Sequence, residues 1–581
     1  MAEYVLGISA FYHDSAACLL KDGVIVAAAQ EERFTRVKQD KSFPKNSIQF
    51  CLNQSNITIQ NVDSIVFYEK PILKFYRILN THAQHAPKGF RAFSMAMKSW
   101  LKQKLWIPQI VKRELGFRGE VCFVHHHESH AASAYFSSSF DESAFLTIDG
   151  VGEMATTTYG VAKGNKITTL GEIHFPHSLG LLYSAFTFYC GFKVNSGEYK
   201  LMGLAPYGTP IYVDKILNDV VKVRDDGSIK LNLKYFSFEY GLKMINAEFE
   251  KLFENPARLP ESELTDFYND IAASIQVVTE QIVLKMAKFV QSKTGQDNLC
   301  LSGGVALNCV ANGNLLRSKV FKNIWISPFS GDAGGAVGAA FLAWHNKTDK
   351  PKISVPDSLK SHSYLGPEFS SSEIETKLKD LDLNYHELDA EKLKIQVARD
   401  LTEKQVVGWF SSSMEFGPRA LGARTILASP VFDDMQSHLN LKIKKREGFR
   451  PFAPVVLEEH ANKWFGMERE SKTMLYTYNC LQPEKIPSCV HVDGTSRVQT
   501  LSKVDNEMLY GVLEQFNTMN SCPVLINTSF NERGEPIVCS PIDAIQCFFG
   551  TEMDVLVLGN FVVYKSEQTQ INLNLRKYEM D

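Results

Sequence analysis

The sequence lacks the features that mark secreted, membrane-spanning and nucleic-acid-binding proteins. Its 11 cysteines in 581 residues form no C-x-x-C pair, so we expect neither a disulfide framework nor a redox motif. No apolar run reaches the roughly 18 residues that a membrane span needs, and no basic leader precedes the first strand. The net charge is only −3, which predicts no general attraction to nucleic acid or membranes, although local basic patches remain compatible with it. We therefore expect a reduced, cytoplasmic protein with neither partner.

Three common motifs of nucleotide-binding and protease sites are also missing. There is no G-x-x-x-x-G-K-[ST] segment, so a P-loop is excluded. The stretch from Gly150 to Ala155 fits the dinucleotide fingerprint G-x-G-x-x-A, but threonine-rich sequence typical of a strand follows it where the fingerprint needs a helix. His127-Glu128 begins a zinc-protease motif whose second histidine would fall at Ala131. NAD, FAD and protease assignments are therefore rejected.

The N-terminal part predicts a strand, a polar turn and a returning hairpin. Apolar strands are expected at 4–8, 16–20 and 24–29, and Asp22-Gly23 supplies the hairpin turn. The same layout recurs around Asp149, after a buried strand at 144–148. This repeated arrangement resembles the start of the actin-like ATPase (ASKHA) fold, in which backbone donors of the turns hold phosphate. We predict an α/β protein with domains at 1–350 and 367–581, joined by a linker at 351–366.

A histidine pair beside that second turn predicts a metal site. His126 and His130 are four residues apart, so on a helix they share one face. Asp149 stands at the end of a strand, where its carboxylate is placed to join them. Two imidazoles and a carboxylate suit Fe(II), Zn(II) or Mn(II) and leave positions open for substrate. Ordinary packing of a histidine-bearing helix is the alternative interpretation.

Glycine-punctuated segments predict a nucleotide site in the same domain. Small residues allow a ligand to approach the backbone closely, and a following helix offers free N–H groups to phosphate. Tight turns or close helix packing would explain any one of the segments, whereas several together favour ATP. A loop is expected at 196–208, a long helix at 264–291, and a helical insertion or dimer surface at 75–115. The candidate nucleotide-binding residues in these segments are Lys200, Gly203, Gly303, Gly304, Asn308, Gly331 and Gly334.

The C-terminal part carries a different signal, which is clustered arginine and lysine within apolar sequence. Such clusters are costly unless they meet anions, so a phosphate-binding pocket is favoured over a solvated basic face. Asn527 and Ser529 add polar groups after a hydrophobic stretch. The basic candidates are Arg419, Arg424, Lys444, Arg450 and Arg497.

Taken together, these motifs resemble the NodU/CmcH family of O-carbamoyltransferases over nearly the whole chain. The matching segments are 7–9, 13–17, 31–34, 126–132, 200–208, 302–306, 415–424, 444–454 and 527–531.

The resemblance implies a two-step enzyme. A C-terminal domain similar to the YrdC fold would use ATP, with Mg²⁺, and carbamoyl phosphate to make carbamoyl-adenylate. The N-terminal domain would pass the carbamoyl group to the hydroxyl of a small-molecule acceptor at a divalent metal, with Fe(II) the first candidate. The family pattern adds Asp332 to His126, His130 and Asp149 as metal ligands. It places the five basic residues, with Asn527 and Ser529, at the activating site.

Other assignments stay open. His13 or Asp14, in the first turn, would serve as base for the attacking hydroxyl, and a purely structural cap is equally compatible with Asp14. Transfer of a threonylcarbamoyl group to tRNA is a second hypothesis, weakened by the absence of a basic tRNA-binding module. A non-catalytic nucleotide-binding module is a third. The sequence does not identify the acceptor alcohol, and it is compatible with a homodimer.

Overall fold

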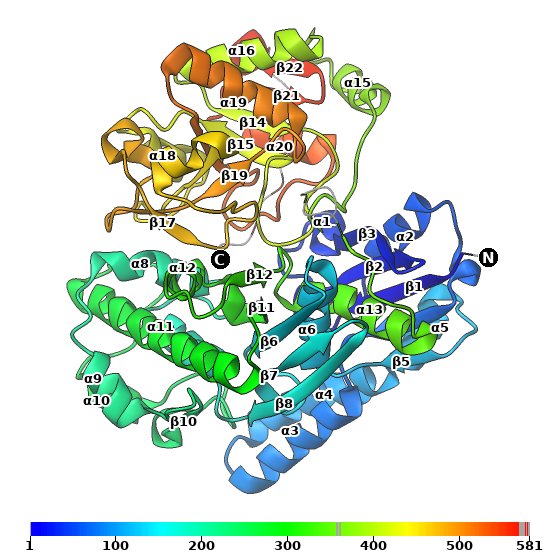
Figure 1. Cartoon of the computed structure of the whole chain (residues 1–581), viewed down its shortest axis with the longest axis vertical. Coiled ribbons are helices and arrows are strands. Elements are labelled where there is room, and N and C mark those ends of the chain that lie inside the picture. The colour runs from blue at the N-terminus through cyan, green and yellow to red at the C-terminus, as the bar shows by residue number, and fades with distance from the viewer. Residues whose placement is uncertain (1, 356–357, 359–361, 569–575, 577, 579–581) are drawn as a thin grey trace. The chain divides into compact units, whose positions relative to one another are not determined.

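A computed structural model describes residues 2–355, 358, 362–568, 576 and 578. The chain divides into two compact units, both α/β (Figure 1). The first comprises Met1–Glu31 and Lys41–Val355, and the second comprises Glu32–Asp40 and Pro356–Asp581. The predicted linker at 351–366 lies partly outside the described residues. No helix in the described part of the chain is long and apolar enough to cross a membrane.

The first unit contains two five-stranded sheets with one shared topology. In each, three antiparallel strands are followed by two strands parallel to the first of the three. Sheet one has the order β3-β2-β1-β4-β5, formed by β1 (Tyr4–Ser9), β2 (Ala16–Lys21), β3 (Val24–Gln30), β4 (Ser64–Phe67) and β5 (Val121–Phe123). Sheet two has the order β8-β7-β6-β11-β12, formed by β6 (Glu142–Ile148), β7 (Ala155–Lys163), β8 (Lys166–His174), β11 (Asn298–Ser302) and β12 (Asn323–Ile326). This duplication confirms the predicted actin-like fold.

Two helices in the first unit pack closely against each other and against the sheets. Helix α13 (Gly335–Thr348) packs on β1, β2 and β4, and α6 (His126–Ser137) packs on β6 and β11. A Cβ at Gly338 would overlap the backbone oxygen of Ser129 on α6, and one at Gly7 would overlap that of Ala336 on α13. Only glycine permits these approaches. They bring the two helices, and the loops that precede them, together.

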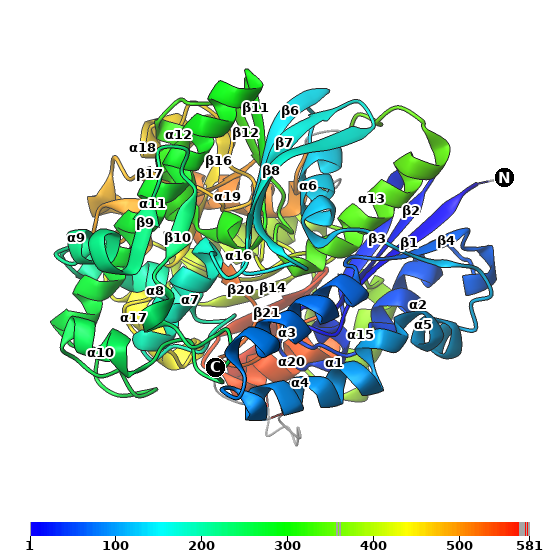
Figure 2. The same ribbon diagram turned by 90° about the horizontal axis from the view of Figure 1, so that it is seen from below.

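The remaining helices of this unit include two of the predicted helical segments. The predicted long helix is α11 (Asp266–Thr294), and the predicted helical insertion is α3 (Pro71–His85), α4 (Phe90–Lys102) and α5 (Ile107–Leu115). Helices α3 and α4 run side by side at one edge of the unit (Figure 1 and Figure 2). The expected loop at 196–208 is wrong, because its centre forms helix α8 (Glu198–Leu204) and most of its residues are buried. The others are α2 (Lys45–Gln54), α7 (Leu179–Tyr189), α10 (Ala247–Phe253) and α12 (Cys309–Arg317), with a small hairpin of β9 (Val221–Val223) and β10 (Ile229–Leu231).

The second unit is built on a mixed eight-stranded sheet around one large apolar core. Its order is β13-β22-β21-β14-β15-β20-β16-β19, formed by β13 (His386–Glu387), β14 (Val407–Phe410), β15 (Arg424–Ala428), β16 (Ala453–Leu457), β19 (Gln499–Leu501), β20 (Val524–Ser529), β21 (Val555–Leu558) and β22 (Phe561–Tyr564). Its helices include α15 (Ser371–Asp380), α16 (Ala390–Thr402), α17 (Met435–His438), α18 (Ala461–Phe465), α19 (Glu507–Asn520) and α20 (Pro541–Gly550). A separate hairpin joins β17 (Thr477–Asn479) to β18 (Thr495–Arg497). The resemblance of this unit to the YrdC fold stays a prediction.

A short N-terminal segment, residues 32–40, belongs to the second unit. It contains α1 (Glu32–Thr35), and Phe34 packs against Met414, Ala420, Ile537 and Cys539. The Arg36 guanidinium lies 2.9 Å from Glu535 and 3.5 Å from Asp543, and all three side chains are buried. Arg36 also donates to the carbonyl oxygens of Pro536 and Ile537. The polypeptide therefore passes between the units three times, which the sequence division at 350 did not foresee.

Arg36→Met is expected to destabilise the second unit by about 3–5 kcal/mol, because it leaves the buried Glu535 carboxylate without its cation, whereas Asp543 keeps its ion pair with Arg576. Denaturant unfolding followed by tryptophan fluorescence, to which Trp409 and Trp464 of the second unit contribute, measures this. Lys404→Met is the matched control, since Lys404 is 44% exposed in its ion pair with Asp434. Exposed pairs contribute about 1 kcal/mol or less. Equal destabilisation by the two variants would contradict the anchoring role of Arg36.

Candidate functional site

The parallel strands of sheet two bring three loops to one edge. Asp149 directly follows β6, Gly303 and Gly304 follow β11, and Asp332 opens the turn between β12 and α13. These strands are parallel, so their carboxyl ends meet. The Gly304 N–H donates to Asp149 Oδ1 at 3.0 Å, and the Gly303 N–H donates to the carbonyl oxygen of Ser330 at 3.0 Å. The three loops therefore form one connected rim.

Helix α6 delivers two histidines to this rim from its first turns. His126 and His130 are fully buried, as the helix packs between α13 and sheet two. The start of α6 is held by Glu153, whose carboxylate accepts the His126 N–H at 3.0 and 3.2 Å. The same carboxylate accepts the Lys70 N–H at 2.7 Å. Glu153 thereby satisfies a backbone donor at the helix start and sets the position of His126.

Four side chains converge on one point. The ligand atoms of His126, His130, Asp149 and Asp332 all lie within 4.8 Å of one another, and all four residues are buried. His126 Nε2 lies 3.2 Å from His130 Nε2 and 3.1 Å from Asp149 Oδ2. Asp332 Oδ1 lies 3.4 Å from His130 Nε2 and 3.8 Å from His126 Nε2. The sequence prediction for the histidines and Asp149, and the family-based addition of Asp332, thus fall on one cluster.

The geometry of this quartet fits a divalent metal. Ligands held at about 2.0–2.1 Å from one ion lie roughly 3.0–3.4 Å apart when they are neighbours in its shell. Three of the measured separations, 3.1, 3.2 and 3.4 Å, are in or near that range. Two imidazoles and two carboxylates are ligands that Fe(II), Mn(II) and Zn(II) accept. The buried Nδ1 atoms of both histidines have no hydrogen-bond partner among the described residues, so no described protein group provides the second contact that a ligating histidine customarily makes.

The electrostatics of the quartet are governed by its two carboxylates and the histidines beside them. Burial alone would lower the pKa of His126, but the hydrogen bond that His126 donates to Asp149 and the charge of Asp332 outweigh it and raise that pKa to about 9. The pKa of Asp149 is held well below its usual value, because its contacts with the histidines overcome the effect of burial. The pKa of the neighbouring His127 falls to about 3 through burial and the nearby His126. The carboxylates are therefore ionised and attract a cation.

Glu153→Gln is expected to weaken metal binding about 10- to 100-fold, the usual effect of losing a group that orients a ligand. The amide keeps the shape of the side chain but loses the charge that holds the first N–H of α6. Titration of the purified protein with Mn²⁺ measures the affinity. Glu128 is exposed in the first turn of α6, so the control variant Glu128→Gln should leave the Mn²⁺ affinity unaltered. Unchanged affinity in Glu153→Gln would refute the positioning role.

The first turn of sheet one reaches the same place. His13 Nε2 lies 3.7 Å from Asp332 Oδ2, and His13 Nδ1 lies 3.0 Å from Asp14 Oδ2. Asp14 adopts a left-handed backbone conformation, with φ of 51°. Burial would lower the pKa of His13, but Asp332 and Asp14 raise it to about 9. Asp14 therefore orients His13, and His13 is the residue of this pair that faces Asp332 and the quartet.

The residues predicted to bind a nucleotide lie in the rim loops, at the start of α12 and on α8 of the first unit. Gly303, Gly304, Gly331 and Gly334 line the loops of the rim, where Gly303 has φ of 88° and a Cβ would overlap the carbonyl oxygen of Ile148. Asn308 caps α12 and exchanges side-chain hydrogen bonds with Gln276. Lys200 and Gly203 are buried on α8. A nucleotide role for these residues stays a prediction.

In the second unit, a buried lysine lies at the end of β20. Lys444 is 3% exposed, and its Nζ donates to four oxygens of Ser529 and Asn531 at 2.6–3.3 Å. Burial lowers the pKa of this amine well below its usual value, and the positive charges of Arg446 and Arg450 lower it further. Two further cations beside a lysine that has no ion pair among the described residues favour an anion.

Arg424 behaves differently from the other basic candidates. Its side chain is completely buried, and its guanidinium lies 3.6 Å from the Phe410 ring centre. It donates to the carbonyl oxygens of Ser411, Ser412, Ala423 and Pro367. Burial lowers its pKa to about 10. These contacts favour a role in holding the preceding loop over direct phosphate binding.

The other predicted residues of the activating site lie on neighbouring elements of the same unit. Asn527, on β20, donates to Gln499 and accepts the hydroxyl of Thr425. Arg450 lies 3.5 Å from Glu447, Arg497 ends β18, and Arg419 precedes β15; all three are partly exposed. Their contact with a substrate stays a prediction.

Comparisons with known proteins agree on one family. The family described as carbamoyltransferase N-terminus matches residues 4–341, and that described as carbamoyltransferase C-terminus matches residues 398–565. The chain belongs to the carbamoyltransferase family. Membership makes it a transferase of the carbamoyl group and implies carbamoyl phosphate as its substrate.

Two relatives align with nearly all of this carbamoyltransferase. The uncharacterised protein sll1178 of Synechocystis is 52% identical, covering 98% of this chain and 97% of its own. Nodulation protein NolNO of Sinorhizobium fredii is 34% identical, covering 96% of this chain and 79% of its own. Among solved structures, the (R)-2-hydroxyglutaryl-CoA dehydratase component A of Acidaminococcus fermentans is 15% identical, covering 59% of this chain and 98% of that one. Its TM-score of 0.32 is too low to support an argument.

Sequence reasoning missed two residues that organise the loops and helix starts around the candidate sites. Glu153 was seen only as part of a rejected fingerprint, because its partner is a backbone N–H and no residue spacing marks it. Glu415 accepts the N–H groups of Leu421, Ala423 and Arg424 and so shapes the loop before β15. No local pattern pointed to this loop-closing role.

Proposed function

We propose that this carbamoyltransferase couples ATP-dependent activation to O-carbamoylation of a small molecule. In the first step, carbamoyl phosphate and ATP would give carbamoyl-adenylate in the second unit, with release of phosphate and pyrophosphate. In the second step, a hydroxyl of a natural product or sugar would take the carbamoyl group in the first unit, and AMP would leave. Adenylation supplies the good leaving group that carbamate lacks.

The observation that carries this proposal is the buried quartet of His126, His130, Asp149 and Asp332 with His13 beside it. These four residues would hold a divalent metal, for which Fe(II) is our first candidate. Such an ion supplies Lewis-acid stabilisation of negative charge on a carbamoyl or phosphate oxygen. Because the quartet is buried, it keeps bulk water from a reactive acyl donor.

His13 is the candidate proton acceptor for the attacking hydroxyl once a bound cation offsets the negative charge of Asp332, which raises the His13 pKa. Asp14 holds its Nδ1, which leaves Nε2 directed towards Asp332. In this arrangement the hydroxyl proton would pass to His13 Nε2 while the oxygen attacks the carbamoyl carbon. The glycine loops at 303–304 and 331–334 would provide backbone N–H groups for the adenylate phosphate.

The second unit supports the activation step through its basic residues. Lys444, Arg446 and Arg450 concentrate positive charge near Ser529, where phosphoryl oxygens would gain stabilisation as charge builds on them. Arg419 and Arg497 are the further candidates for contacts with carbamoyl phosphate or with the ATP triphosphate, whose Mg²⁺ would enter with it. In this proposal, Arg424 holds the loop that carries Arg419.

The test is pyrophosphate release by the purified full-length protein without an acceptor. Release that requires both ATP and carbamoyl phosphate would support the activation step. Release that requires threonine and bicarbonate in place of carbamoyl phosphate would support the tRNA-modification hypothesis instead. ATP binding without pyrophosphate release under any of these conditions, or after addition of candidate alcohols, would refute an activating enzyme.

A further inference from the structure

The segment from Lys70 to Arg113 has an extreme local charge. It contains ten lysines and arginines and no aspartate or glutamate. Six of these cations are exposed: Lys88, Arg91, Lys98, Lys102, Lys112 and Arg113. The near-neutral net charge of the whole chain, on which the expectation of no membrane partner was based, conceals this patch. We define the cationic helical patch as residues 70–113, which include α3, α4 and α5.

The same segment exposes large apolar side chains. On α3, Ile72, Tyr76 and Leu79 follow the i, i+4, i+7 spacing of one helix face, and they are 74%, 59% and 38% exposed. On the following elements, Phe90 is 68% exposed and Trp106 is 51% exposed. An apolar stripe of this kind normally packs into a core. Here it faces solvent, so it is available for contact with an apolar partner.

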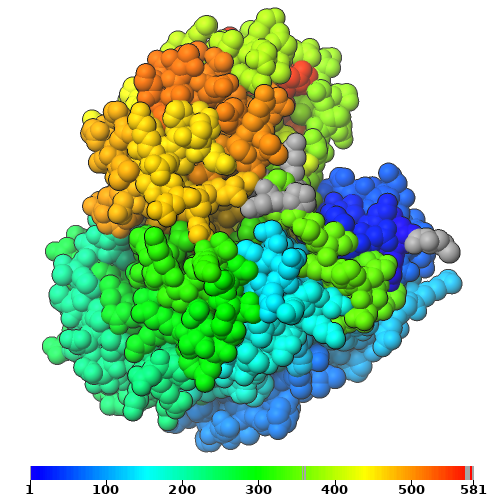
Figure 3. Space-filling view, viewed as in Figure 1, coloured from blue at the N-terminus to red at the C-terminus, as the bar shows by residue number. Residues whose placement is uncertain are grey.

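Helices α3 and α4 pack against each other, and together they present the exposed cations and the exposed apolar side chains. Phe75 and Trp100 pack with ring centres 5.6 Å apart, and His82 stacks on Phe93 at 3.8 Å. On α4, Arg91, Lys98 and Lys102 share an exposed face with the apolar Met95. Residues of this part of the chain form the lower edge of the first unit in the space-filling view, where they are blue (Figure 3).

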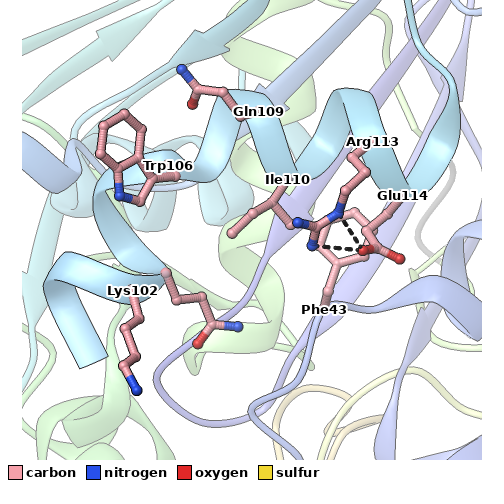
Figure 4. Close-up of a pocket in the computed structure, with 8 residues that line it drawn as sticks. Phe43, Lys102, Trp106, Gln109, Ile110, Arg113 and Glu114 are labelled. Carbon is pink, nitrogen blue, oxygen red and sulfur yellow. Dashed lines mark hydrogen bonds and ion pairs between the residues drawn. The ribbon is translucent and has the colours of Figure 1, made fainter. Parts of the chain in front are cut away.

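A hollow next to α4 offers a place for an anionic group. It has a volume of about 570 Å³, and its lining includes Lys102, Trp106, Ile110 and Arg113 (Figure 4). The lining also contains the carboxylate of Glu114, which pairs with Arg113 at 2.9 Å. A cation, an aromatic ring and an aliphatic side chain around one hollow suit a phosphate headgroup with hydrocarbon beside it.

We propose that the cationic helical patch binds the surface of an anionic phospholipid membrane. The charge complements an anionic lipid surface, and the exposed aromatic and aliphatic side chains insert at the boundary between headgroups and acyl chains. Nucleic acid and acidic proteins share the charge complementarity. Nucleic acid makes no use of the outward apolar face of α3, so lipid is favoured. This inference does not depend on the proposed reaction.

The test is sedimentation of the full-length protein with vesicles of phosphatidylcholine alone and of phosphatidylcholine with 30 mol% phosphatidylglycerol, the latter fraction being about that of a strongly anionic leaflet. Binding is expected only to the anionic vesicles and should weaken at high salt. Lys98→Gln/Lys102→Gln/Lys112→Gln is expected to reduce the vesicle affinity roughly 10- to 100-fold. Lys166→Gln/Lys222→Gln/Lys230→Gln removes the same charge from exposed positions elsewhere in the first unit and should bind like the natural protein.

Insertion is tested separately. Brominated acyl chains should quench the fluorescence of the natural protein more than that of Trp106→Phe, because Trp106 enters the acyl boundary. Equal loss of vesicle binding in the two triple-glutamine variants would overturn the proposal. So would absent binding to anionic vesicles together with tight binding of a short RNA duplex, which would assign the patch to nucleic acid.

Discussion

Replacing His130 by alanine is expected to lower the metal affinity of the protein by at least about 100-fold, more than the loss of an orienting partner costs. His130 Nε2 lies 3.2 Å from His126 Nε2 and 3.4 Å from Asp332, so its removal opens one side of the quartet. The measurement is metal content after dialysis, together with Mn²⁺ titration. Pyrophosphate release should persist, because the activation step is assigned to the other unit.

The matched control for this change is His127→Gln. His127 is equally buried on the same helix, but it is not one of the four clustered ligands. Its side chain faces Thr158 at 3.4 Å. We therefore expect His127→Gln to retain the metal even if its stability falls. Metal loss in both variants would show that helix α6 had unfolded, and full metal retention in His130→Ala would refute the proposed ligand set.

The architecture of the first unit was largely predictable from local sequence patterns. Hairpins such as β2–β3 are specified by short apolar strands and the Asp22-Gly23 turn, where both residues have positive φ. The duplicated layout was predictable because the strands and turns of both sheets carry the same short-range sequence signals. Helix α8 was missed because its glycine and proline neighbours suggested a loop, whereas burial of its apolar side chains stabilises a helix.

The site was predictable in part. The spacing of His126 and His130 and the strand end at Asp149 are local, so they could be found directly. Asp332 is 183 positions after Asp149, and only the family resemblance linked them. Glu153 could not be found by spacing, because its partner is a backbone N–H that becomes available only when α6 begins at His126.

The burial of charged side chains was the least predictable property. Arg424 and Arg450 look alike in sequence, but one is completely buried against carbonyl oxygens and the other is partly exposed. The return of residues 32–40 to the second unit depends on the contact of Arg36 with Glu535, 499 positions away. No local pattern contains such a long-range contact.

Lys444→Gln is expected to slow the activation step about 10²- to 10³-fold, the usual effect of removing one donor that stabilises developing negative charge. The amine is held on Ser529 and Asn531, and its pKa is lowered by burial and by the positive charges of Arg446 and Arg450. A bound phosphoryl group would restore that charge and hold it in place. Pyrophosphate release under saturating ATP and carbamoyl phosphate measures the rate.

The stability of this variant distinguishes function from folding. Removing a desolvated cation relieves an electrostatic penalty, so Lys444→Gln should unfold at nearly the same denaturant concentration as the natural protein. The adjacent Lys445→Gln is the control, because Lys445 is 52% exposed in its ion pair with Glu532. It should keep full activity, since exposed pairs contribute about 1 kcal/mol or less. A stable Lys444→Gln variant with normal pyrophosphate release would remove Lys444 from the activating site.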